Sequence, residues 1–291
     1  MPPRFVLPAA LVSMLVPSAA SAGPAIASHR AVYDLTLAQQ GQDIIDAQGR
    51  IALELHNSCD HFDLNYRFVA RFVEDQEMIL TDQRTTSRET MAGDRFEFTT
   101  QAFVDGVQHS VTKGEAVNDG NATRVELEEP AAQTFELPLS VFPMKHTVEL
   151  IEQAEMGRRI VEVPIFDGDQ DANQLLTSTA IIIPDATRDA ETAGRSGPKP
   201  DSKQATAQTK PDGGDAKGKQ AIRSALAGLK SWRVSESYYS ADSNEDGMPI
   251  FRTAYRLYEN GVSDELLLDY GSYALEGGLS TLDYLDAPAC P

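Results

Sequence analysis

The sequence predicts a mainly β protein whose strands follow one another as antiparallel hairpins. Three observations carry this prediction. Apolar and polar residues alternate with a period of two in many segments, turn motifs separate these segments, and one long amphipathic helical pattern interrupts them. The 291 residues are enough for one large core or two modest ones. The same hairpin pattern occurs on both sides of a low-complexity segment, which favours one continuous sheet system.

The first half of the chain is expected to form a meander of strands. Residues 29–38 place Ala31, Tyr33 and Leu35 on one face of an expected strand. Asp105-Gly106 and Asp119-Gly120-Asn121 permit the positive φ values of tight turns. Further strands are expected at residues 51–58, 62–73, 77–90, 94–103, 107–116 and 122–128.

One amphipathic helix is expected at residues 143–157. Pro143 suits a first helical turn, and Gly157 suits a left-handed cap. Met144, Val148 and Ile151 fall on one face, which we expect to pack against the sheet. The polar face is acidic, whereas helices that lie on membrane surfaces favour basic residues. The pattern therefore favours a core-packing helix over a membrane-surface helix.

The second half returns to hairpins around a segment of low complexity. Residues 185–220 have no aromatic side chain and little apolar surface, which predicts a disordered insertion. A tether or a partner-binding arm is the alternative to a tolerated insertion. A short helix is expected near 221–230, and Glu259-Asn260-Gly261 predicts a hairpin turn. Strands are expected at residues 158–166, 174–184, 231–240, 250–259, 265–275 and 277–286.

The first 22 residues have the pattern of an export signal. Arg4 precedes an apolar run, and Ala20-Ser21-Ala22 matches a signal-peptidase site. The apolar run is shorter than the roughly 20 residues that a spanning helix needs. We therefore predict a signal peptide at 1–22 and a single mature domain at 23–291, with no stable membrane insertion. A buried helix or a membrane anchor is the alternative.

The charge balance limits the classes of partner. The chain has 25 Lys and Arg residues against 44 Asp and Glu residues, a net charge of −19. Nucleic-acid binding requires clustered basic residues, and anionic lipid attracts basic segments. The composition therefore argues against both partners and fits an acidic, solvated surface.

The two cysteines are the predicted covalent link of the chain. Cys59 lies early in the sequence and Cys290 is the penultimate residue. In an exported chain an even cysteine count predicts a disulfide, which would join the C-terminal end to the early strands. In the alternative, both thiols are free and Cys290 favours dimerisation.

Motifs for metal binding are incomplete. His56, Cys59 and His61 lie close in sequence, but structural zinc needs four ligands. Residues 242–247 match the start of a calcium loop, but Thr253 stands where the bidentate acid belongs. Residues 167–171 form a similar acidic turn. We expect no metal and no cofactor.

Motifs for catalysis are also absent from the sequence. There is no G-x-S-x-G elbow and no phosphate-binding glycine loop. The Gly-Arg-Ser-Gly run at 194–197 lies in the low-complexity segment. Trp232, Tyr238 and Tyr239 could line a binding face, but aromatic residues on strands are more often part of a core. We therefore expect no catalytic residues and no enzyme.

Three segments together resemble a known family. They are HRAVYDLTL at 29–37, FPMKHTVELIEQAEMGRRIVEVPIFDGD at 142–169 and RLYENGVSDELLLDYGSYALEGGLSTLDYLDAPAC at 256–290. In this order they resemble the EipB family of alphaproteobacteria, formerly a domain of unknown function. The resemblance extends from about residue 29 to residue 290 and is interrupted only at 185–220.

The resemblance implies a fold and a role. It implies a periplasmic protein that supports cell-envelope integrity, including under envelope stress, without an established enzymatic activity. It implies an open, strongly curved antiparallel β-spiral with one amphipathic helix packed in its hollow. It also implies a disulfide at the positions of Cys59 and Cys290. We therefore expect a scaffold or interaction protein with an unknown periplasmic partner. The alternative is a carrier or binder of lipid or lipid-modified peptide, an apolar ligand held in the hollow.

Overall fold

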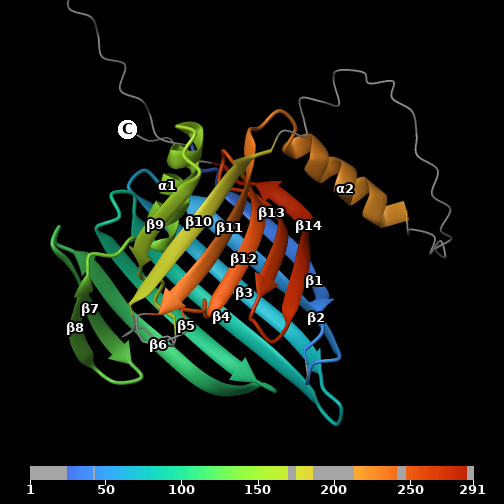
Figure 1. The fold of residues 1–291 in the computed structure, drawn as a ribbon, viewed down its shortest axis with the longest axis horizontal. Coiled ribbons are helices and arrows are strands. Elements are labelled where there is room, and N and C mark those ends of the chain that lie inside the picture. The colour runs from blue at the N-terminus through green and yellow to red at the C-terminus, as the bar shows by residue number, and fades with distance from the viewer. Residues whose placement is uncertain (1–24, 42, 170–174, 186–212, 241–246, 287–291) are drawn as a thin grey trace, which may run out of the picture.

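A computed structural model describes residues 25–41, 43–169, 175–185, 213–240 and 247–286. In these ranges the chain forms one sheet of fourteen strands and two helices (Figure 1). The helices are α1 (Pro143–Glu155) and α2 (Gly213–Ala225). The strands are β1 (His29–Gln39), β2 (Asp46–Asn57), β3 (His61–Val73), β4 (Met78–Thr90), β5 (Arg95–Val104), β6 (Val107–Asn118), β7 (Ala122–Glu129), β8 (Gln133–Pro138), β9 (Ile160–Ile165), β10 (Leu176–Pro184), β11 (Ser231–Ser240), β12 (Phe251–Tyr258), β13 (Ser263–Asp269) and β14 (Ala274–Tyr284).

The sheet is a meander that curves back on itself. Its strand order is β8-β7-β6-β5-β4-β3-β2-β1-β14-β13-β12-β11-β10-β9, and every pairing is antiparallel. The first and last strands pair with each other, so the only open seam of this order lies between β8 and β9. A single parallel bridge between Val141 and Ile165 lies at the seam. The structure therefore confirms the predicted open, strongly curved antiparallel sheet.

Alternation along each strand separates an inner face from an outer face. On β1, Ala31, Tyr33 and Leu35 are buried, whereas between them Val32 is half-buried and Asp34 is exposed. The outer face of neighbouring strands carries ion pairs, such as Arg50 with Asp34 at 2.7 Å. The period of two in the sequence thus decides which side chains enter the hollow.

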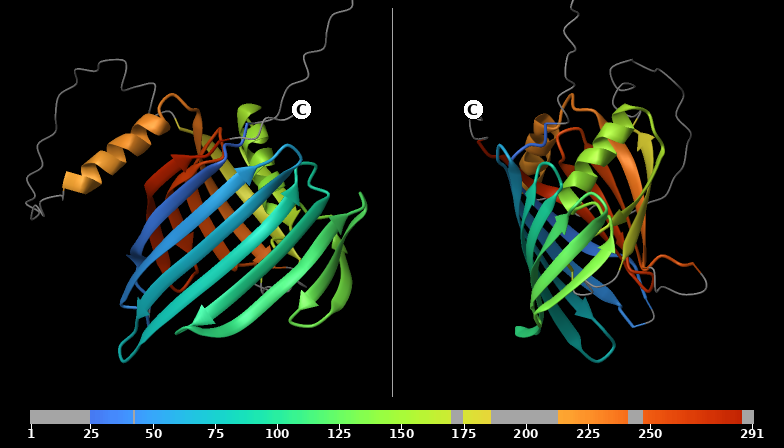
Figure 2. Two further views of the ribbon diagram at one scale, coloured as in Figure 1. Left: turned by 180° about the vertical axis from the view of Figure 1, so that it is seen from behind. Right: turned by 90° about the vertical axis from the view of Figure 1, so that its left-hand side faces the viewer.

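Helix α1 occupies one end of the hollow, as predicted. Figure 2 shows it between the two walls of the curved sheet. Its buried residues Leu150 and Ile151 pack with Leu55 of β2 on one wall and Trp232 and Val234 of β11 on the other. The apolar stripe of the helix is therefore covered on both sides, which explains why an amphipathic helix is stable in this position.

Helix α2 corrects the predicted extent of the insertion. Residues 185–220 are expected from their composition to be disordered, but the helix begins at Gly213. Ile222 and Leu226 are buried in one cluster with Tyr258 and Leu279, beside β14. Ile222 of α2 and Leu226, which directly follows the helix, lie in the range 221–230 where a short helix was expected. The observed helix therefore begins earlier in the chain than its apolar residues indicate. Residues 186–212 lie outside the described residues.

Two strand predictions were also wrong. The expected strand at 265–275 is two strands, because the chain turns at Tyr270–Tyr273, where Gly271 has a φ of 82°. Strand β8 was not expected, because its six residues end in proline and show a weak alternation. All six of its residues pair with Ala122–Leu127 of β7, which supplies the missing stabilisation.

A cluster of aromatic rings closes the region near the seam. Phe96 and Phe98 of β5 are buried with Phe142, which precedes α1, and with Phe166, which follows β9. The centroids of the Phe96 and Phe142 rings lie 5.3 Å apart, and those of Phe98 and Phe166 lie 5.5 Å apart. The cluster therefore links β5 to the start of α1 and to the end of β9.

The start of the first strand, β1, and the end of the last strand, β14, lie side by side. Ser28 accepts a hydrogen bond from the Asn57 amide through its hydroxyl and one from the Leu285 amide through its carbonyl. The chain before Cys59 and the chain before Cys290 therefore contact the same residue. The predicted signal peptide at 1–22 lies outside the described residues. Within the described ranges, no helix is long and apolar enough to cross a membrane.

Candidate functional site

A buried carboxylate organises the inner face beside α1. Glu236 of β11 lies on the inner, apolar face that carries Trp232 and Val234. It is only 1% exposed, although its side chain is a carboxylate. Its Oε2 accepts hydrogen bonds from the hydroxyl of Tyr238 at 2.5 Å and from that of Ser178 at 3.1 Å. The hydroxyl of Tyr255 donates to its Oε1. The Nε2 of His146, on α1, lies 3.3 Å from Oε2.

These donors keep the carboxylate ionised in spite of its burial. Burial alone would raise the pKa of Glu236, but hydrogen bonds from His146 and the two tyrosines outweigh it and lower this pKa. Burial and the neighbouring carboxylate in turn raise the pKa of Tyr238 and Tyr255. The Nδ1 atom of His146 is buried and has no hydrogen-bond partner in the described part of the chain. The cluster fixes α1 to β10, β11 and β12.

A second buried carboxylate holds the N-terminus of α1. The residue before the helix is Phe142, whose side chain cannot cap it. Glu89, at the end of β4, instead accepts hydrogen bonds from the backbone amides of Met144 at 2.7 Å and Lys145 at 2.6 Å. Its side chain is 1% exposed, and burial raises its pKa to about 7 in spite of these two hydrogen bonds. Acids from opposite walls therefore anchor the helix.

The opposite end of the hollow holds two further carboxylates. Asp167 and Asp169 follow β9, and Gln83 of β4 donates a hydrogen bond to Asp169 at 3.4 Å. Surrounding protein atoms, together with the charge of Asp169, raise the pKa of Asp167 to about 6. Gly168 stands between them because a Cβ there would lie 2.6 Å from the Phe98 ring and its φ is 70°.

A row of aromatic side chains runs along the same end. The rings of Tyr238, Phe251, Tyr270 and Tyr273 follow one another at centroid distances of 5.8, 4.9 and 4.9 Å. Phe72 of β3 adds an edge contact to Tyr273 at 5.4 Å. The row therefore connects β11 and the β13–β14 turn to β3. Within it, Tyr270 is exposed to solvent and Tyr273 is half-buried.

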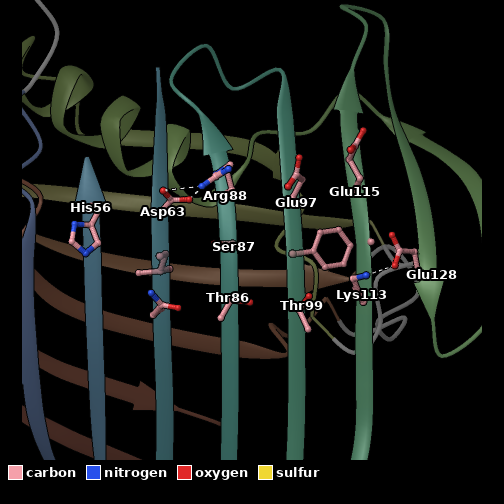
Figure 3. A pocket seen from close by; sticks show the side chains of 14 residues that line it. His56, Asp63, Thr86, Ser87, Arg88, Glu97, Thr99, Lys113, Glu115 and Glu128 are labelled. Atoms are coloured by element: carbon pink, nitrogen blue, oxygen red, sulfur yellow. Dashed lines mark hydrogen bonds and ion pairs between the residues drawn. The ribbon is translucent and has the colours of Figure 1, made fainter. Parts of the chain in front are cut away.

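The outer face carries a separate polar groove of about 630 Å³ (Figure 3). It crosses strands β2 to β7, and the side chains in it are mainly charged or hydroxyl-bearing. Arg88 donates to Asp63 at 2.7 Å, and Lys113 pairs with Glu128. Most charges of the groove are therefore neutralised within it, so the groove favours polar surface contacts rather than one charged ligand.

The residues singled out in the sequence are distributed over the fold. Trp232 is 5% exposed and belongs to the core, as expected, whereas Tyr238 joins the Glu236 cluster. His56 lies in the outer groove, and His61 pairs with Asp60 and Asp63. Within the described ranges, no group of three or more His, Cys, Asp or Glu side chains could hold a metal ion. Residues 242–246 of the incomplete calcium loop lie outside those ranges.

The predicted disulfide remains a prediction. Cys59 lies in the turn between β2 and β3, at the end of the sheet where β14 also ends. Cys290 lies outside the described residues. The end of β14 nevertheless lies near the turn that holds Cys59. Strands β14 and β2 both pair with β1, and His29 pairs with a residue near the end of each of them.

Sequence reasoning did not identify Glu89 and Glu236 as site residues. The sequence did contain a signal for Glu236. It lies on the same face of its strand as the aromatic or apolar residues Trp232, Val234 and Tyr238, and it is the only acid among them. An acid on an apolar face must find hydrogen-bond donors when it is buried. No comparable signal marked Glu89, because its partners lie more than fifty residues away in the chain.

Comparison with known proteins shows the family of the chain. A profile of the family described as EipB-like matches residues 20–286. The chain belongs to the EipB-like family. Cell envelope integrity protein EipB of Brucella abortus (strain 2308) is 32% identical over 274 residues, which cover 92% of this chain and 88% of that protein.

The fold of this EipB-like chain is also found in a solved structure. The crystal structure of a beta-barrel-like protein of a domain of unknown function from Brucella abortus has a TM-score of 0.75 and 29% sequence identity. The match covers 90% of this chain and 99% of that chain. The overall fold of the chain is therefore shared with that protein.

Proposed function

We propose that this EipB-like chain is a non-enzymatic periplasmic protein that supports cell-envelope integrity as a scaffold or interaction protein. The predicted export signal supports the compartment, and the relationship to a cell envelope integrity protein supports the process. In such a protein the buried polar groups stabilise the fold, whereas in an enzyme some of them would react with a substrate.

The observation that carries this proposal is the arrangement around Glu236 and Glu89. A catalytic acid or base must reach a substrate. Glu236 instead receives hydrogen bonds from four side chains, and Glu89 is bound to two backbone amides. Both carboxylates are 1% exposed and hold α1 in the hollow. Their chemistry is that of a structural anchor.

Complementation tests this proposal. Deletion of the gene from the organism that encodes the chain should increase sensitivity to detergent, and the wild-type gene should restore resistance. Ser178→Ala and Asp167→Asn should restore it as well, provided that the variants keep their melting temperature. Loss of rescue by either variant with an intact fold would instead indicate chemistry at that group.

The second candidate function is a carrier of an acyl chain or a lipid-modified peptide. One observation favours it: several apolar residues on the inner face are only partly buried, although strands surround them. They are Leu53, Tyr66, Phe68, Leu266, Leu268 and Tyr273. A hollow that retains accessible apolar surface is typical of a ligand site.

A pair of matched threonines distinguishes the carrier from the scaffold. Thr253 lies on the inner face, since it pairs with Glu236, and Thr179 lies on the outer face of β10. If an acyl chain enters the hollow, Thr253→Trp should reduce binding of the fluorescent fatty acid cis-parinaric acid, and Thr179→Trp should not. Native mass spectrometry that finds no acyl ligand, with no probe binding to the wild type, would retire the carrier.

A further inference from the structure

Five turns lie side by side at the end of the sheet opposite α1. They connect β5–β6, β3–β4, β1–β2, β13–β14 and β11–β12, and these pairs follow one another in the strand order. Figure 1 shows the described parts of these turns along the lower end of the sheet, residues 241–246 of the β11–β12 connection lying outside the described residues. We call residues 43–46, 74–80, 104–107, 247–250 and 269–273 the rim. Because neighbouring turns adjoin, the rim is one continuous surface.

The rim carries large apolar side chains that face solvent. Their exposed fractions range from 37% at Val104 to 70% at Val107. Such a concentration on one surface of a protein marks an interaction site, whereas single exposed apolar residues do not. The exposed apolar residues of the rim are Ile45, Met78, Leu80, Val104, Val107, Met248, Ile250 and Tyr270.

The rim contains a groove of about 570 Å³ between three of its turns. Asp43 and Ile44 of the β1–β2 turn, Glu74 of the β3–β4 turn and Tyr273 of the β13–β14 turn line it. The β1–β2 and β13–β14 turns are pressed together, since a Cβ on Gly41 would lie 2.5 Å from a backbone oxygen of the other turn. The walls of this rim groove are therefore held in place by packing.

The rim segments are acidic, although Arg252 pairs with Asp269 at 2.6 Å and the guanidinium of Arg71 lies 3.8 Å from the sulfur of Met78. The five segments contain seven Asp and Glu residues and no Lys or Arg: Asp43, Asp46, Glu74, Asp75, Glu77, Asp105 and Asp269. Anionic lipid would be repelled by this surface, and a second copy of the chain would bring a second acidic rim. A basic partner is attracted to it. Charge complementarity thus selects among the occupants that the apolar side chains would accept.

We propose that the rim is the docking surface for a basic, amphipathic segment of a partner protein, with a Lys or Arg side chain seated in the rim groove. This proposal rests on the proposed function as an interaction protein and names the chemistry of the partner. The cationic group lies between Asp43 and Glu74, and its aliphatic stem packs on Ile44 and the Tyr273 ring. Apolar side chains of the segment cover Ile45 and Met78.

A synthetic peptide tests the docking surface directly. A fluorescein-labelled Leu/Lys amphipathic peptide of about 18 residues is titrated with the full chain, and anisotropy is recorded at about 50 mM salt. Saturable binding is expected, and it should weaken at about 500 mM salt because exposed charges are then screened. A Leu/Glu peptide of the same length should not bind.

Paired variants separate the rim from the general acidity of the chain. Ile45→Ser with Met78→Ser should weaken binding of the Leu/Lys peptide about tenfold, because two exposed apolar contacts are lost. Ile181→Ser with Ile183→Ser is the matched control, since these residues are 50% and 51% exposed on the strand β10. The control should bind within about twofold of the wild type.

A second pair of variants tests the charges. Asp43→Asn with Glu74→Gln should also weaken binding about tenfold and reduce its salt dependence. Glu97→Gln with Glu136→Gln removes the same number of charges elsewhere and should leave binding unchanged. The substituted side chains are accessible, so melting temperatures of all variants should match that of the wild type.

Four results of the binding experiments would overturn the proposal: no saturable binding, equal loss in rim and control variants, equal binding of the Leu/Glu peptide, or capture of phosphatidylcholine and phosphatidylglycerol vesicles through the rim. Complementation separates this proposal from the proposed function. If the wild-type gene restores detergent resistance and both rim variants do so equally, the rim proposal fails alone. If deletion causes no envelope defect, the proposed function itself fails.

Discussion

The buried carboxylate of Glu89 makes a prediction about how stability depends on pH. In the unfolded chain a glutamate has a pKa near 4.5, whereas in the folded chain burial raises this pKa to about 7. Between these values the unfolded state releases the proton and the folded state retains it. Glu89 therefore contributes stability that is fully present below about pH 4.5 and is lost as the pH rises to about 7.

The magnitude follows from the size of the shift. A shift of one pKa unit corresponds to about 1.4 kcal/mol, so the full contribution is about 3 kcal/mol, and most of it is lost between about pH 5 and pH 8. Glu89→Gln has the shape of the protonated acid and does not titrate. We therefore expect the free energy of unfolding of the variant, relative to the wild type, to rise by about 2.5 kcal/mol over this interval.

Urea denaturation followed by circular dichroism at about pH 5, 6, 7 and 8 measures this difference. Other titrating groups are shared by both proteins, so they cancel in the comparison. At the acid end the variant should be equal to the wild type or less stable by about 1 kcal/mol, because its amide NH₂ cannot accept a helix amide. A difference between the two proteins that stays constant with pH would refute the reasoning.

Three further predictions concern other anchors of the fold. Glu236→Ala should lower the free energy of unfolding by about 3–5 kcal/mol, because its buried donors lose their acceptor; an unchanged melting temperature would contradict this role. Gly168→Ala should be clearly more destabilising than Gly120→Ala, because both have positive φ but only the first has no room for a Cβ; equal losses in thermal melting would show that packing at Gly168 is unimportant. Cys59→Ser and Cys290→Ser should each cost up to about 5 kcal/mol, with no further loss in the double variant, whereas two titratable thiols in the wild-type protein would exclude the disulfide.

The sequence alone determined the class of the fold and the assignment of faces. The period of two and the turn motifs predicted most strands of the meander, because hairpin pairing is local and each turn is encoded where it occurs. The helix at 143–157 was predicted for the same reason, since its proline, its glycine and its apolar stripe are all local signals. Strand β8 and the turn at Tyr270–Tyr273 were missed where those signals were weak or were masked by continuing apolar residues.

Only the tertiary structure decided the contacts between residues far apart in the chain. The cap that Glu89 provides for α1, the donors around Glu236 and the approach of Phe98 to Gly168 all join different strands across the hollow. The rim belongs to the same class, because an exposed Met or Ile in one turn is unremarkable until five turns lie side by side. The alternation of apolar and polar residues within a strand predicts which side chains face inward. The register and curvature of the whole sheet decide which of them meet, since these depend on every pairing at once.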